Sequence, residues 1–191
     1  MKKIKKILFI APLFMLSCAS PYLKNYESIL TFLETQKLDK HKIYVLQKDK
    51  ISNTEPLRLF NGNDGLDHYT PKNRTHDTFH SKHWKKMYTT YANDTIIKYW
   101  KKADFKEYNF TLENSKILYS RVYYENYLNN LESAYQIIKL SEPLYYWNKK
   151  YLLFSYDIGY LYSGSNTKVI IMKKEKNKYV FYGYLNDYIH N

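Results

Sequence analysis

The pattern of apolar and polar positions predicts helices in the first half of the chain and strands in the last third. Apolar residues recur at helical spacing in residues 21–36 and 78–103, and Asn93-Asp94-Thr95 can divide the second of these helices. Residues 42–48, with the sequence KIYVLQK, read as a strand. Residues 49–77 combine turn signals with few periodic apolar positions, which predicts a long loop of the kind that often carries function.

Four apolar stretches in the last third read as strands, namely SAYQIIKLSEP, KYLLFSYDIGYLY, KVIIMKKE and KYVFYGYL. The last two are separated by a tight turn at Lys176-Asn177. The stretch from Tyr108 to Leu128 is compatible with either strand or helix. The predicted fold class is therefore α+β, with N-terminal helices followed by a C-terminal antiparallel β-meander of about four strands.

The N-terminus has the three parts of a secretory signal peptide. Four lysines fall within the first six residues, an apolar run from Ile7 to Leu16 follows, and small residues surround Cys18. The run is too short to span a bilayer, which takes about 20 apolar residues. We therefore expect an exported protein.

Met15-Leu16-Ser17-Cys18 resembles the lipobox of bacterial lipoproteins. The resemblance implies that Cys18 receives a diacylglycerol, that residues 1–17 are removed, and that residues 18–191 form a single lipid-anchored globular domain. In this family, an Asp after the cysteine often retains the protein in the inner membrane, and here Ala19 follows. The expected location is the outer membrane, facing the periplasm.

The cysteine content and the net charge limit the kinds of metal site, ligand and partner that we expect. Cys18 is the only cysteine, so a mature domain with an acylated Cys18 has neither disulfides nor a thiolate metal site. Four of the twelve net positive charges lie in residues 1–17, which leaves +8 after cleavage. Only three of the 30 basic residues are arginines, the residue favoured for reading base edges. We expect no nucleic-acid partner, and a general attraction to anionic lipid headgroups or acidic polymers.

Tyrosine is unusually abundant, with 23 residues in the chain. Tyr suits half-buried strand faces because it has an apolar ring and a polar tip. The same residues could instead form an aromatic binding platform. The predicted binding surface is the Tyr-rich sheet together with the 49–77 loop.

Four of the six histidines lie close together in the sequence, at His68, His76, His80 and His83. If residues 76–84 are helical, His76 and His80 stand one turn apart, with His83 three residues further on. Three such ligands suit Zn²⁺. Solvated histidines at the start of a helix are the alternative. The spacing differs from the zincin motif, because Asp77 rather than Glu follows the first histidine.

No catalytic residue can be assigned from the sequence. The chain has no Gly-x-Ser-x-Gly elbow, and its five glycines form no phosphate-binding loop. We expect a non-catalytic binding or structural module of the cell envelope, without a cofactor, whose partners are the membrane and an envelope protein or acidic polymer. The alternative is a His-dependent metal-binding protein or hydrolase that uses the 68–83 cluster.

The C-terminal third resembles the end of uncharacterised Bacteroidetes-type envelope proteins. These proteins carry Ser-x-Pro before a strand, and then a hairpin with Lys and Asn. The matching residues are Ser141, Pro143, Lys174 and Asn177, whereas the family's Gly and Trp are replaced here by Lys178 and Tyr179. The resemblance implies an architecture and no activity.

Overall fold

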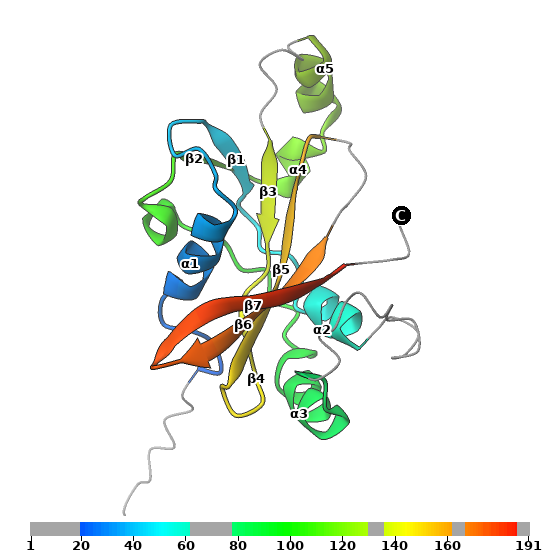
Figure 1. Cartoon of the computed structure of the whole chain (residues 1–191). Helices are drawn as coiled ribbons and strands as arrows, with labels where there is room; N and C mark the ends of the chain where they lie inside the picture. The colour runs from blue at the N-terminus through cyan, green and yellow to red at the C-terminus, as the bar shows by residue number, and fades with distance from the viewer. Residues whose placement is uncertain (1–19, 62–77, 130–135, 162–166, 187–191) are drawn as a thin grey trace, which may run out of the picture.

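The computed structural model describes residues 20–61, 78–129, 136–161 and 167–186 (Figure 1). Within these residues the chain forms helices and a seven-stranded sheet. The helices are α1 (Glu27–Thr35), α2 (Thr54–Phe60), α3 (Ser81–Tyr91), the 3-10 helix η3 (Lys102–Phe105), α4 (Ser115–Leu118) and α5 (Arg121–Asn129). The strands are β1 (Tyr44–Gln47), β2 (Phe110–Glu113), β3 (Ile137–Leu140), β4 (Leu144–Tyr146), β5 (Tyr151–Gly159), β6 (Lys168–Glu175) and β7 (Lys178–Asn186).

The sheet combines a parallel part with an antiparallel part. Its strands lie in the order β2-β1-β3-β5-β6-β7, and β4 pairs with β5 outside this path. β1 is parallel to both of its neighbours, so Val45 lies opposite Thr111 of β2 and Ile137 of β3. The pairs β3–β5, β4–β5, β5–β6 and β6–β7 are all antiparallel.

Strand β5 is buried along most of its length because both faces of the sheet are covered. Leu152, Phe154 and Tyr156 point to one hydrophobic cluster, whereas Tyr151 and Leu153 point to another. This division follows from the two-residue period of a strand. Two cores therefore lie on opposite faces of one sheet.

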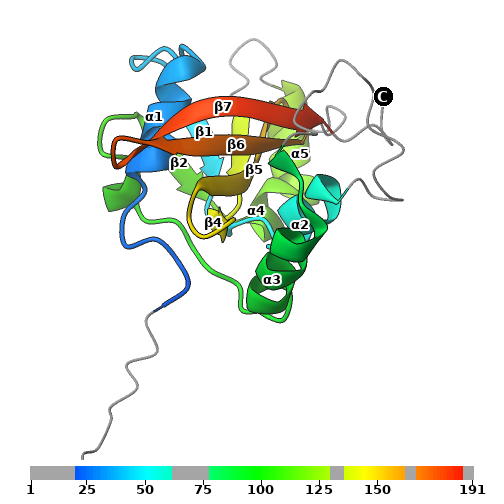
Figure 2. The ribbon, with the colours of Figure 1, turned by 60° about the horizontal axis from the view of Figure 1, so that its bottom comes forward.

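Helices complete each core. On one face, α1 contributes Ile29 and Phe32. On the other face, α2 contributes Phe60, and α3 contributes Met87 and Tyr91. Figures 1 and 2 show α1 on one side of the sheet, with α2 and α3 on the other. Among the described residues, no helix is both long and apolar enough to cross a membrane.

The predicted mixture of helices and a C-terminal antiparallel sheet is confirmed, and β1 lies within the predicted strand over 42–48. The predicted strand count, and the separation of N-terminal helices from C-terminal strands, are wrong. The C-terminal part contains β4 in addition to the four predicted strands, and β1 and β2 lie among the helices that precede it. β4 is only three residues long, too short to show a period. The pairing of β1 with β2 and β3 joins segments far apart in sequence, which local patterns do not encode.

Two predicted helical boundaries also need correction. The predicted helix over 78–103 ends at Tyr91, and residues 98–100 run beside residues 48–50, where Trp100 N donates to the Lys48 carbonyl at 2.8 Å. The β-branched run Thr95-Ile96-Ile97 disfavours helix continuation. The first helix begins at Glu27 rather than residue 21.

The predicted loop over 49–77 contains α2, which packs Leu57 and Phe60 into the core. Residues 62–77 lie outside the described residues. The proline at the third position of α2 is compatible with a helix, because the first-turn amides have no intrahelical acceptor.

Candidate functional site

His80 and His83 lie side by side at the start of α3. Their ring centroids are 5.9 Å apart. Both contact Trp147, His80 by an edge at 4.2 Å and His83 by stacking at 4.9 Å. His68 and His76 lie outside the described residues. The structure therefore brings together two of the three predicted zinc ligands.

The two imidazole side chains of His80 and His83 fit zinc chemistry in part. Burial, the neighbouring His80 and nearby lysines lower the pKa of His83, which favours the neutral form that binds metal. A catalytic zinc site takes three protein ligands. In residues 78–129 and the other described ranges, no group of three or more His, Cys, Asp or Glu could hold a metal ion. Zinc binding stays a prediction.

Trp147 belongs to a tight turn with unusual backbone geometry. The β4–β5 turn places Trp147, Asn148 and Lys149 at φ values of 47°, 51° and 64°, without a glycine. Left-handed backbone costs an ordinary L-residue roughly 1–2 kcal/mol, so such residues mark places where the surroundings fix the chain. The β6–β7 turn also has positive φ, 45° at Lys176 and 70° at Asn177. This confirms the predicted tight turn.

The β4–β5 turn separates two hollows in the surface. One, of about 420 Å³, is lined by Pro21, residues of α3 and the turn itself. The other, of about 410 Å³, is lined by residues 20–31 and the β6–β7 turn. Tyr145 and Lys149 line both hollows. Both volumes fall within the range of about 300–1,000 Å³ that is usual for small-ligand sites.

Four exposed lysines line the two hollows: Lys24, Lys86, Lys149 and Lys178. Within the described ranges, none of the four has a carboxylate ion-pair partner. Glu27 is the one acidic residue in either lining. We call this surface, defined by the four lysines and the two turns, the basic end. Its elements lie toward the lower part of the molecule in Figure 1.

The first described residues run through the basic end and are fixed there. The Tyr91 hydroxyl donates to the Pro21 carbonyl at 2.8 Å and accepts from the Tyr145 amide at 3.1 Å. The Tyr22 hydroxyl donates to Asp94 and accepts from the Asn53 side chain at 2.8 Å. We call residues 20–26 the tether segment. These contacts join it to α3, to the sheet and to the loop after α3.

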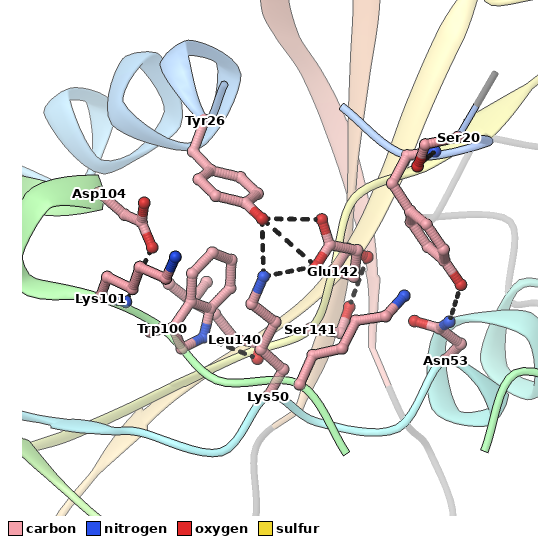
Figure 3. Close-up of polar contacts among 12 residues, drawn as sticks. Ser20, Tyr26, Lys50, Asn53, Trp100, Lys101, Asp104, Leu140, Ser141 and Glu142 are labelled. Carbon is pink, nitrogen blue, oxygen red and sulfur yellow. Dashed lines mark hydrogen bonds and ion pairs between the residues drawn. The ribbon is translucent and has the colours of Figure 1, made fainter. Parts of the chain in front are cut away.

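A buried ion pair holds the far end of the tether segment (Figure 3). Lys50 Nζ lies 2.5 Å from Glu142 Oε2, and the two side chains are only 6% and 4% exposed. The Tyr26 hydroxyl donates to Glu142 Oε1 at 3.1 Å and accepts from Lys50 at 2.7 Å. The Lys50 ammonium also lies 3.9 Å from the Trp100 ring centroid. We call these four residues the Lys50–Glu142 cluster.

The charges of the Lys50–Glu142 cluster compensate one another. Burial lowers the pKa of Lys50, and the contact with Glu142 opposes this shift. Burial and the negative charge of Glu142 raise the pKa of Tyr26. The cluster adjoins a hollow of about 100 Å³ that Asp94 and Lys98 also line, and these two form their own ion pair at 2.7 Å. Each of the four charges is therefore neutralised by another. Such an arrangement suits a structural connection between segments of the chain better than a substrate site.

Sequence reasoning did not single out Lys50, Glu142 or Tyr26. Lys50 and Glu142 are 92 positions apart and come from segments without a recognisable motif. The sequence did contain one relevant signal, the polar triplet Ser141-Glu142-Pro143 at the end of a predicted strand. Such a signal indicates a strand terminus, but it does not name the partner.

The tyrosines of the sheet are partly buried and partly exposed. Tyr44, Tyr146, Tyr151 and Tyr156 are at most 5% exposed, because helices cover both faces. Exposed aromatic rings of the sheet lie on the edge strand β7, at Phe181, Tyr182 and Tyr184. The surface that carries the two hollows is the basic end.

Comparison of the chain with protein-family models, curated proteins and solved structures found no significant match.

Proposed function

We propose that the chain is a lipid-anchored module of the bacterial cell envelope that faces the periplasm and binds an envelope component without catalysis. In this proposal, residues 1–17 are the signal peptide and Cys18 carries the lipid. Cys18 lies outside the described residues. One observation supports the proposal most: the tether segment, which begins two residues after Cys18, is fixed to the body at the basic end.

The short distance along the chain links the anchor to the basic end. A residue spans at most about 3.6 Å, so the Cα atoms of Cys18 and Ser20 are separated by no more than about 7 Å. Ser20 lines one of the two hollows. A lipid on Cys18 would therefore bring the basic end to the membrane surface, whatever the conformation of the intervening residues.

The polar networks of the described residues favour binding over catalysis. The Lys50–Glu142 cluster and the Asp94–Lys98 pair are internally neutralised. The lysines of the basic end lack carboxylate partners among the described residues, so they are available for an anionic ligand. Acidic polymers and acidic envelope proteins share the required charge.

The mass of the N-terminal peptide tests the anchor. The full chain, expressed in a Gram-negative host, should yield from the membrane fraction a tryptic peptide Cys18–Lys24 that carries a diacylglycerol and an acyl chain. The Cys18→Ser variant should lose this peptide and leave the outer membrane. An unmodified N-terminal peptide, with the same fractionation for both proteins, would contradict the proposal.

The second candidate function is zinc binding, which the adjacency of His80 and His83 favours. Zn²⁺ should raise the melting temperature of the wild-type chain, and the His80→Ala/His83→Ala variant should abolish the rise, whereas the His41→Ala control should keep it. An equal response of all three chains to Zn²⁺, or no response from the wild type, would remove this candidate and the hydrolase alternative with it.

A further inference from the structure

We propose that the basic end is a binding site for the phosphodiester headgroups of anionic phospholipids in the membrane that carries the anchor. The inference deepens the proposed function and rests on it for the orientation of the molecule. It assigns a ligand class to the two hollows and a role to the four lysines that line them.

Charge is the first argument for this ligand. Lys24 and Lys178 line one hollow, Lys86 lines the other, and Lys149 lines both. With Glu27 as the single acidic residue in these linings, positive charge predominates. Helix α3 adds two further lysines, Lys82 and Lys85, and has no acidic residue. A lysine near an anionic membrane surface contributes about 1 kcal/mol to binding.

Aromatic residues are the second argument. Tyr145, Trp147 and Tyr179 are half-buried, and each lines one or both of the hollows. Tyr and Trp favour the headgroup level of a bilayer because their rings are apolar and their tips polar. Lys149 Nζ lies 4.9 Å from the Tyr145 ring centroid, so a cationic group and an aromatic group are adjacent at this surface.

The third argument is that hydrogen bonds within the fold hold the backbone that carries the lysines. The Tyr179 hydroxyl donates to the Lys149 carbonyl at 2.7 Å and so ties the β6–β7 hairpin to the β4–β5 turn. Lys149 and Lys176 have positive φ, which a non-glycine residue keeps only where the surrounding structure favours it. A fixed arrangement of ligand-binding groups loses less conformational entropy when it binds.

The tether segment favours lipid over other anions. Pro21 lines one hollow and Ser20 lines the other, so the chain enters from the anchor between the two sites. An acidic polymer or acidic protein would match the charge equally well, but the anchor places neither at this end of the molecule. Competition by those ligands is accordingly an outcome of the test.

Vesicle co-sedimentation tests the inference independently of acylation. Every described element lies within residues 20–186, so the unacylated chain Ala19–Asn191 keeps the whole described fold. We expect it to bind vesicles of phosphatidylcholine with phosphatidylglycerol, and not pure phosphatidylcholine. The quadruple variant Lys24→Gln/Lys86→Gln/Lys149→Gln/Lys178→Gln should lose roughly 30-fold or more of the vesicle partition coefficient.

A matched control removes four exposed lysines that line neither hollow, in the variant Lys42→Gln/Lys102→Gln/Lys106→Gln/Lys116→Gln. It carries the same net charge and should lose less than roughly threefold, since distant charges are screened beyond about 10 Å. Circular dichroism and thermal melting must show both variants folded. Equal losses in the two variants would overturn the inference, because binding would then depend on net charge alone.

Two competition experiments distinguish the bilayer surface from other anionic ligands. Excess glycerol phosphate should leave vesicle binding largely intact if the ligand is the bilayer surface, whereas complete displacement would indicate a free phosphate ester and overturn the lipid assignment. Polyglutamate that binds more tightly than the anionic vesicles would favour an acidic polymer and also overturn it. Because the chain is unacylated, failure here leaves the test of Cys18 acylation unaffected.

Discussion

Glu142 and Lys50 form an ion pair and both contact Tyr26, and Lys50 also lies against the Trp100 ring. The desolvation of two buried charges is offset by their attraction only while both are present. Since Tyr26 ends the tether segment, this ion pair fixes the chain between the proposed anchor and the first helix. At the level of single residues, the cluster therefore connects the tether segment to the sheet and is not a reactive group.

The Glu142→Gln substitution should be strongly destabilising. It would leave the Lys50 ammonium buried without a counter-charge, and the free energy of unfolding should fall by about 3–5 kcal/mol. Urea denaturation measures this fall. The double variant Lys50→Met/Glu142→Leu removes both charges and should cost much less than Glu142→Gln alone. If the double variant lowered the free energy of unfolding more than Glu142→Gln does, the stabilisation by the cluster would depend on packing rather than on charge pairing.

Buried tyrosines predict how stability responds to alkaline pH. Burial raises the pKa of both Tyr91 and Tyr146 to about 12, from an ordinary value of about 10. The unfolded chain therefore ionises first, so the stabilisation is complete below pH 10 and is lost as the pH rises from about 10 to about 12. Each of these tyrosines should lower the free energy of unfolding by about 1.4 kcal/mol per pH unit in that window. In urea titrations at several alkaline pH values, Tyr146→Phe should flatten the slope, and an unchanged slope would contradict this assignment.

Turns are the elements that shape the basic end. The β4–β5 and β6–β7 turns contain five of the six non-glycine residues with positive φ among the described residues. The two-residue β6–β7 turn matches the hairpin type that has φ above zero at both central positions and that favours glycine second. Here Lys176 and Asn177 occupy those positions.

Replacing Asn177 with glycine should therefore stabilise the fold. Asn177→Gly relieves the left-handed strain and should raise the free energy of unfolding by about 0.5–1 kcal/mol. Asn177→Ala is the control and should lower it, because alanine has no side chain to favour φ near 70°. Thermal melting of the three proteins gives the ranking Gly above Asn above Ala, and any other order would show that the turn is not strained.

The sequence predicted elements best where periodicity was long. The four predicted C-terminal strands and the Lys176-Asn177 turn follow from apolar periodicity and turn chemistry, and the structure contains them. β4 and α2 were missed, since three and seven residues carry too little pattern. The helix over 78–103 was predicted too long, because Trp100 is buried through tertiary pairing with the segment around Lys48 and not by helical packing.

At the scale of the whole molecule, the candidate site was predictable only in part. Composition indicated basic charge and abundant tyrosine, but the prediction placed the binding surface on the sheet and the 49–77 loop. The lysines of the basic end come from four segments, and only the tertiary fold brings Lys24, Lys86, Lys149 and Lys178 to the same two hollows. His80 and His83 were predicted together with His76 as zinc ligands. The contact of His83 with Trp147 depends on a left-handed turn that the sequence WNKK does not predict.

In the proposed orientation, the anchored molecule turns its basic end to the membrane. Depth-dependent fluorescence quenching tests it most directly, because Cys18 is the only cysteine and its acylation would leave no free thiol. A label would be attached to Asn25→Cys, which lines a hollow, or to Ile117→Cys on α4, where the native side chain is 45% exposed. In vesicles that contain headgroup-quencher lipids, we expect quenching several-fold stronger at position 25 than at position 117. Equal quenching, or stronger quenching at position 117, would contradict it.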